Sequence, residues 1–449
     1  MLGRKERDQL EFFVAGSLRD LPPDDHVLVR VDRVLDLNWL HSEVAGLYCP
    51  DNGRPGIDPE VAVRLMLAGF VLGIVQDRRL MREAQVNLAI RWFAGYGLHE
   101  ALPDHSSLTR IRQRWGEALF RKVFMRIVQD CAQAGLITAE AVHMDASLIR
   151  ADVSMDALVD QHLDAVQDAN DDQRQARTTG KFKKLCGSDP DATMATSSGA
   201  PLRPSYKQHT AVDDHAGVVV DIDVVTGEEH DTGRFKERLD AMATTLGRRP
   251  RRITADKAYG TGQVYAALEA RETDYVIPNR KAVRRKDMRG FPVERFKYDA
   301  RKDRVRCPEG KVLSPRTATK TGRWYRVERG DCAACPLKDR CIPGAAAARR
   351  VHITNHFPAI LRARRKRRRW GEAERGIYNR HRWRVEGAHG TAKTLHGLNR
   401  ATRRGLENMK IQALLTAVAM NLKKLAAAAL LIIRTILETA TMRPPRATA

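Results

Sequence analysis

The sequence predicts an α/β fold in which a mixed β-sheet is flanked by helices and preceded by a helical N-terminal region. Polar and apolar residues alternate over 141–148, which is the period-two pattern of a strand with one polar face. A hairpin pattern follows at 206–225, then a short strand at 251–255, and residues 371–396 form a helical stretch without proline. Strands and helices mixed along the chain in this way are typical of an α/β domain.

Two aspartates stand where such a fold could hold a metal ion. Asp145 lies on the polar face of the first strand, together with His143 and Ser147. Asp256 directly follows the strand at 251–255, and the carboxyl ends of strands are where α/β sheets place their ligands. Asp152 is the second choice for the first acid, because the polar alternation favours Asp145.

A glutamate in the helix at 371–396 supplies a third acid. Glu386 follows Arg382 by four residues and precedes His389 and Lys393 by three and seven, a spacing that predicts one shared helix face. An aspartate on a strand, an aspartate at a strand end and a glutamate on a helix form the order of a ribonuclease-H-like phosphoryl-transfer site. Each acid taken alone is as well explained by a structural role, so the prediction depends on their order.

In these motifs the chain resembles the DDE transposases of bacterial insertion sequences, in the branch whose third acid lies in a Tyr-Arg-Glu-Lys helix. The resemblance extends from about residue 40 to about residue 425. The family pattern places Arg four residues before Glu and Lys seven after it, and Arg382, Glu386 and Lys393 match both spacings. Tyr378 departs from the pattern, because it lies four residues before Arg382 where the family has three.

The resemblance implies an enzyme that cuts and joins DNA. Asp145, Asp256 and Glu386 would be catalytic and would hold two Mg²⁺ (or Mn²⁺) ions. Its partners would be double-stranded DNA, both the terminal inverted repeats and the target, and two DNA ends imply at least a homodimer. His230 and Asp231 resemble a His-Asp pair of the family, although an ordinary helix N-cap would have the same sequence.

The composition favours a nucleic-acid partner. The chain has 78 Lys and Arg against 55 Asp and Glu, a formal net charge of +23, as a protein that neutralises many phosphates would carry. A basic ribosome-associated or membrane-surface protein would have the same balance. The residues predicted to bind DNA come from the basic run at 362–369 and from the Glu386 helix: Arg364, Arg365, Lys366, Arg367, Arg382 and Lys393.

Four of the seven cysteines lie close together in the sequence. A Cys-x2-Cys pair with two further cysteines in a basic segment predicts a structural Zn²⁺ site, and similar inserts occur in some relatives of this transposase branch. An insert with free thiols would also fit the spacing. The candidate ligands are Cys307, Cys332, Cys335 and Cys341.

The order of these patterns predicts five segments. Residues 1–40 are expected to be an extended lead-in. A later helix carries Arg110, Arg112 and Arg114, which favours a DNA-binding role for the helical region. A generic helical bundle with a solvated basic face would have the same pattern. The segments are an N-terminal helical DNA-binding domain (1–136), the first part of the catalytic domain (137–279, with an insert at 151–203), a basic insert with the cysteines (280–357), the second part of the catalytic domain (358–400), and a C-terminal helix and tail (401–449).

The sequence also predicts a cytoplasmic protein without membrane contact. The N-terminus is charged rather than signal-like, and the apolar run at 425–433 is shorter than the roughly 20 residues that a membrane span needs. Two rival functions stay open. One is a metal-dependent nuclease on the same fold that cuts DNA without joining it, and the other is a zinc-containing DNA-binding protein without catalysis.

Overall fold

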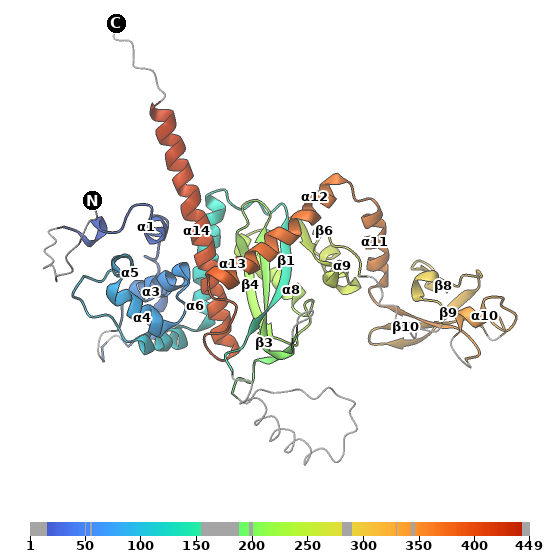
Figure 1. The fold of residues 1–449 in the computed structure, drawn as a ribbon. Helices are drawn as coiled ribbons and strands as arrows, with labels where there is room; N and C mark the ends of the chain where they lie inside the picture. The colour runs from blue at the N-terminus through green and yellow to red at the C-terminus, as the bar shows by residue number, and fades with distance from the viewer. Residues whose placement is uncertain are drawn as a thin grey trace, which may run out of the picture.

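A computed structural model describes residues 16–441, apart from gaps at 50, 54–55, 154–187, 197–200, 281–289, 329 and 343–345. Most of the predicted insert at 151–203 lies outside the described residues. The described residues form a mixed α/β structure with two separate sheets (Figure 1). The predicted α/β fold class is therefore confirmed.

The described residues from 16 to 133 form helices and connecting loops. Asp58 caps α3 (Pro59–Leu72), because its Oδ1 accepts hydrogen bonds from the amides of Glu60 and Val61 at 2.7 and 3.2 Å. The prediction of an extended lead-in to residue 40 was wrong, since Leu28 and Val31 are buried and hold a helix there. The helices are α1 (Val27–Asp32), α2 (Leu40–Val44), α3 (Pro59–Leu72), α4 (Asp77–Val86), α5 (Leu88–Phe93) and α6 (His105–Gln133).

The main sheet contains both antiparallel and parallel pairs. Along the sheet the order is β4, β3, β1, β5 and β6, with β2 paired to the first residues of β3. The first three strands of this order are antiparallel, and β1, β5 and β6 are parallel. The predicted hairpin is confirmed as β3 and β4, although only β3 lies directly beside β1. The strands are β1 (Val142–Arg150), β2 (Thr193–Ala195), β3 (Arg203–Asp213), β4 (Val219–Thr226), β5 (Arg252–Ala255) and β6 (Asp274–Val276), and the helices between them are α8 (Phe235–Leu246) and α9 (Gly262–Glu269).

A second, smaller sheet follows β6 and carries the clustered cysteines. Its strands are ordered β11-β10-β9-β8-β7, and their inner side chains form a separate hydrophobic core. Figure 1 shows this sheet at one end of the molecule. The elements are β7 (Lys297–Asp299), β8 (Arg304–Arg306), β9 (Val312–Thr319), β10 (Gly322–Arg326), α10 (Lys338–Cys341) and β11 (Arg350–Thr354).

Three helices return the chain to the main sheet. Phe357 of α11 (Phe357–Arg368) is buried in the small core, while Ala359 and Ala363 of the same helix belong to the main core. A continuous helical segment then comprises α12 (Glu372–His381), a π-helical turn (Arg382–Glu386) and α13 (Gly387–Leu395). This segment confirms the helix predicted at 371–396.

The last helix, α14 (Leu406–Thr441), lies between the N-terminal helices and the sheet (Figure 1). Asn421, buried on α14, donates to the carbonyl and accepts from the amide of Val219, at 2.8 and 2.9 Å, and so completes the bonding of β4. Residues Leu406–Ile432 are long and apolar enough to cross a membrane, and more than half of the apolar stretch is buried. Core helices of soluble proteins have the same character, so this length alone is weak evidence for a membrane span.

Candidate functional site

The two predicted aspartates lie level with one another on neighbouring strands. β1 and β5 are parallel, and their register pairs His143 with Thr254 and Met144 with Ala255. The next residues in line are Asp145 and Asp256. Because neighbouring strands are about 4.8 Å apart, the two carboxylates start from adjacent backbone positions.

Asp145 is in an environment that disfavours its negative charge. Burial raises the pKa of the Asp145 carboxyl to about 7, and the nearby negative charges of Asp256, Asp231 and Glu386 contribute to the rise. Its side chain is 26% exposed, so it remains accessible from solvent. A carboxylate that is both desolvated and surrounded by like charges is stabilised by a bound cation, so these residues fit a divalent metal ion.

The helical segment at 372–395 lies along the polar face of β1. The rings of His143 and His381 are 5.5 Å apart, and Nδ1 of His389 is 3.9 Å from Oδ2 of Asp145. Further along, the predicted DNA-binding Lys393 donates from Nζ to Oγ of Ser147 at 2.7 Å. The alternation placed three polar residues on this face of β1: His143, Asp145 and Ser147. Each of them therefore has a partner on the helical segment.

The predicted common face of the Glu386 helix is only partly correct. Arg382 and Glu386 do meet, with Nε of Arg382 3.2 Å from Oε2 of Glu386, and both side chains are exposed. His389 is buried against β1, and Lys393 is partly buried there. The π-helical turn that ends at Glu386 holds more residues per turn than an α-helix, so the spacing of a regular helix does not apply across it.

A fourth carboxylate stands beside the three predicted acids. Asp231 follows β4, and Nζ of Lys207 holds its Oδ1 at 2.8 Å. Asp231 and Asp256 line a cleft of about 750 Å³, whose wall also carries cations and an aromatic ring. The other lining residues include His230, Lys257, Arg280, Arg367 and Tyr378.

The alternative reading of His230 and Asp231 as a helix N-cap was wrong. α8 begins at Phe235, its N-cap is Arg234, and no side chain caps it. His230 instead accepts a hydrogen bond from the amide of Thr232 within a turn, at 3.2 Å. The sequence signal for this pair was its resemblance to the family motif, because no local pattern distinguishes a loop aspartate from one that faces a cleft.

In this structure the acids are not arranged as the coordination sphere of a metal ion. Among the described residues, no three His, Cys, Asp or Glu side chains are close enough together to hold a metal ion as they stand. Glu386 remains 61% exposed and paired with Arg382. Like charges repel, so these carboxylates gain from converging only around a cation.

The basic residues predicted to bind DNA fall into two groups. Arg364 and Lys366 form ion pairs with Glu294 and Asp274, so part of their charge is used within the protein. Arg365 is exposed, and the exposed Arg367 lines the cleft beside Tyr378. Arg367 is thus the member of this run that the fold brings nearest to the acids.

One arginine expected on a basic helix face is not available to DNA. Arg112 is 2% exposed, and both ends of its guanidinium donate to Asp77 at 2.7 Å. Arg110 and Arg114, on the same helix, are exposed. The prediction for Arg112 was therefore wrong.

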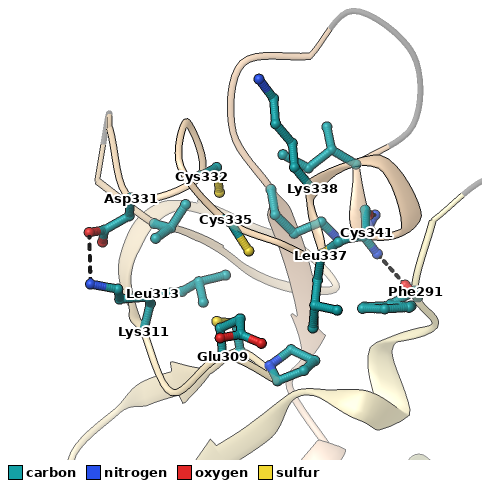
Figure 2. Close-up of a pocket in the computed structure, with 15 residues that line it drawn as sticks. Phe291, Glu309, Lys311, Leu313, Asp331, Cys332, Cys335, Leu337, Lys338 and Cys341 are labelled. Carbon is teal, nitrogen blue, oxygen red and sulfur yellow. Dashed lines mark hydrogen bonds and ion pairs between the residues drawn. The ribbon is translucent and has the colours of Figure 1, made fainter.

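The four clustered cysteines line one small cavity in the second sheet, drawn in Figure 2. Its volume is about 30 Å³. Burial raises the pKa of the Cys341 thiol, and three nearby thiols contribute: Cys332, Cys307 and Cys335. The chain therefore brings all four predicted ligands around one point, although their sulfur atoms are not yet close enough to coordinate an ion.

Replacing Asp145 by asparagine is expected to stabilise the protein when no metal is added. A folded-state pKa of about 7 against 3.8 means that folding with an ionised Asp145 costs free energy. This cost is fully present above about pH 7 and disappears as the pH falls towards 4. The change should raise the free energy of unfolding by about 1–3 kcal/mol at pH 8 and by little at pH 4.5, measured by urea denaturation. Asp152→Asn, at a partly buried position near the end of the same strand, is the control, and an equal gain at both pH values would contradict this explanation.

Comparisons with known proteins point to one family. A family model described as "Transposase domain (DUF772)" matches residues 16–114, and one described as "Transposase DDE domain" matches residues 306–426. The first covers the N-terminal helices up to part of α6. The second covers most of the small sheet, the Glu386 helix and much of α14. A search of curated proteins gives no match.

Two solved transposase structures show distant similarity. A pre-cleavage Mos1 transpososome is 12% identical over 53% of this chain and 65% of the Mos1 chain, with a TM-score of 0.17. A piggyBac transposase synaptic complex with hairpin DNA is 10% identical over 93% of this chain and 80% of the other, with a TM-score of 0.32. The chain thus spans somewhat less than two thirds of the Mos1 chain. Both matching family models describe transposase domains, and the second describes the DDE domain, so these two parts of the chain are similar to those of DDE transposases.

Proposed function

We propose that this protein is a DNA transposase with a ribonuclease-H-like catalytic domain, which cleaves DNA at the ends of a mobile element and joins those ends to a target. The observation that carries this proposal is the register of β1 and β5. It sets Asp145 level with Asp256, and the helical segment with Glu386 lies along the same polar face. The order of antiparallel and parallel strands supports the ribonuclease-H-like assignment.

The carboxylates are proposed to bind divalent ions, of which Mg²⁺ or Mn²⁺ suits oxygen ligands best. Asp145 is near enough to Asp256 and Glu386 for both negative charges to raise its pKa. It would contribute to both ion sites, while Asp256 and Glu386 would each complete one. Bound ions supply the charge that activates water or a DNA 3′-hydroxyl and that stabilises the leaving 3′ oxygen. The buried His389 beside Asp145 would limit its movement.

The cations around the cleft are proposed to hold the phosphates of duplex DNA. Lys257, Arg280 and Arg367 line the same cleft as Asp256. Arg382 is 83% exposed beside Glu386, and Lys393 lies near Asp145. Contacts of this kind position DNA without reading its sequence, so they would hold the scissile phosphate next to the acids.

The experiment that tests this function separates cutting from joining. Purified protein, Mg²⁺ and a duplex that spans an element end are incubated with a supercoiled plasmid as target. A transposase produces strand cuts at the element boundary and covalent joining of the end to the plasmid. Cuts without joined products would favour the alternative nuclease, and DNA binding without cuts would favour the non-catalytic DNA-binding protein.

We also propose that the cysteine cavity holds a structural Zn²⁺ ion. Four thiols around a cavity of about 30 Å³ provide the donor set of a tetrahedral zinc site, and contraction of the loops at Cys332 and Cys335 would bring the sulfur atoms into range. The hydrophobic core beside the cysteines is small and contributes limited stability to this sheet. In modules of this kind, binding of a structural zinc ion adds to the free energy that stabilises the fold.

Substitution of Cys335 by serine is expected to remove this zinc. Elemental analysis should find about one equivalent of zinc per chain in the wild type and much less in Cys335→Ser. Limited proteolysis should then cut the variant faster within 300–345. Cys49→Ser, which changes an exposed and isolated thiol, should keep both the zinc and the protease resistance. If the wild-type protein contained no zinc and still resisted proteolysis within 300–345, the four cysteines would be free thiols.

The remaining assignments follow from this function. We propose that the five sequence segments correspond to the domains predicted above, that the protein acts in the cytoplasm, and that it assembles as a homodimer or larger complex on DNA. Two ends of one element must be cut together, so one active site per end would require two chains. Sedimentation of the protein with and without end DNA measures the number of chains.

A further inference from the structure

The outer face of the second sheet has an unusual composition for a solvent-exposed surface. Tyr325, Val351 and Ile353 point into the small core, and the alternate side chains of the same strands point outward. Among the outward side chains is Trp324, a large aromatic residue that is 39% exposed. The strand pairing slips by one residue at this position, between Arg323 and Tyr325. Such bulges redirect a side chain.

An arginine and an imidazole ring lie beside this tryptophan. The guanidinium of Arg350 lies over the indole at 5.9 Å, and the ring of His352 is 4.9 Å away. Arg326 and Arg350 are directly opposite one another on β10 and β11. Two like charges in such a cross-strand pair destabilise a sheet, so an anionic partner would relieve the repulsion.

The protein supplies little negative charge to this face. None of the three strands β9, β10 and β11 contains an acidic residue. Arg323 forms an ion pair with Asp303, whereas no ion pair to another described residue is found for Arg326 or Arg350. Over residues 290–357 the sequence has 16 Lys and Arg against 7 Asp and Glu, an excess of nine positive charges. The face therefore complements a polyanion.

We propose that this face, centred on Trp324, Arg326 and Arg350, binds the sugar-phosphate backbone of duplex DNA outside the catalytic cleft. The proposal rests on the transposase function proposed above, because that function supplies the duplex. The two arginines would donate to phosphates, and the indole would lie against the deoxyribose between them. Contacts of this kind do not depend on base sequence.

α11 sets the distance between this surface and the acids. The helix begins at Phe357, in the core of the small sheet, and Arg367 near its end lines the catalytic cleft. Ten residues of α-helix span about 15 Å, which corresponds to about four base pairs of duplex. Figure 1 shows the second sheet at the end of the molecule, beyond α11 from the main sheet, so the DNA contacts of this face are expected several base pairs away from the scissile phosphate.

The test compares two pairs of cross-strand cations in the same sheet. Arg326→Ala/Arg350→Ala removes the pair beside Trp324. Lys297→Ala/Arg306→Ala removes an exposed pair on β7 and β8, where the outward side chains include Asp299 and no tryptophan. Both double variants lose the same charge, and zinc content and circular dichroism verify that both are folded.

Affinity for end duplex and for random duplex is measured by fluorescence anisotropy across a salt series, without added Mg²⁺ or Mn²⁺ so that no cleavage occurs. Arg326→Ala/Arg350→Ala should weaken binding to both duplexes by about tenfold or more and lower the salt slope by about two. Trp324→Ala should weaken binding with a nearly unchanged slope. In hydroxyl-radical footprints the double variant should lose protection away from the cleavage site and keep it at that site.

Equal losses for the two double variants would overturn the proposal, because only net charge would then matter. Wild-type affinity and footprint for Arg326→Ala/Arg350→Ala would overturn it as well. Either result leaves the catalytic proposal intact, since binding is measured without metal. Conversely, loss of the distant footprint in a protein that cuts no DNA would support this face while contradicting the transposase function.

Discussion

Alanine at Asp145, Asp256 or Glu386 is expected to reduce strand cleavage in Mg²⁺ by at least about 10³-fold. Loss of a metal-binding carboxylate removes several kcal/mol of transition-state stabilisation, and each 1.36 kcal/mol is tenfold in rate. Affinity for duplex DNA should change by no more than a few-fold, because none of the three acids is expected to contact phosphate directly. Single-turnover cleavage of an end duplex and a parallel binding titration give the two quantities.

Asp152 provides the control for this series. It was the second choice for the first acid, and the structure pairs its carboxylate with Arg400 at 3.0 Å near the end of β1. Asp152→Ala should therefore cleave within a few-fold of the wild type. Wild-type cleavage by any of the three alanine variants would exclude that acid from the site, and a large loss in Asp152→Ala would show that the first acid was misassigned.

Asp77→Ala is expected to have the largest effect on stability, a loss of about 3–5 kcal/mol. Asp77 is 7% exposed and accepts two hydrogen bonds from the buried Arg112. Arg403, which precedes α14, also donates to it. Removal of the carboxylate leaves the buried Arg112 and the partly buried Arg403 without their counter-charge, and it disconnects α4 and α6 from the segment before α14. Urea denaturation measures the loss.

Asp24→Ala is the matched control, because Asp24 also bonds two arginines, Arg19 and Arg33, but at the surface. Its side chain is 76% exposed, and exposed ion pairs contribute little to stability. Asp24→Ala is therefore expected to leave the free energy of unfolding nearly unchanged. Similar losses for Asp77→Ala and Asp24→Ala would show that burial of the network does not determine its contribution.

The strand at Asp145 could be predicted because its pattern is local. Alternation of polar and apolar residues defines a strand with two different faces, and the structure confirms partners for His143, Asp145 and Ser147 on one of them. The position of Asp256 at a strand end was equally readable from its neighbours. What the sequence could not give was the register, which depends on pairing between segments more than 100 residues apart.

Other features of the site had no local signature. The π-helical turn before Glu386 comes from a one-residue shift in backbone hydrogen bonding, which side-chain spacing does not encode. The burial of Arg112 depends on Asp77, 35 residues earlier, so helix periodicity alone suggested a solvated basic face. Asp231 belongs to a loop, and only tertiary structure brings it to the cleft with Asp256.

The central claim is that these carboxylates hold divalent ions which stabilise the leaving 3′ oxygen. Its most direct test is single-turnover cleavage of an end duplex that has sulfur in place of that oxygen. Sulfur is a soft ligand that Mg²⁺ binds poorly and that softer ions accept better. We expect slow cleavage of the sulfur strand in Mg²⁺, recovery in Mn²⁺, and no cleavage by Glu386→Ala in either metal. Equal cleavage in both metals, or cleavage that persists in EDTA, would contradict the account.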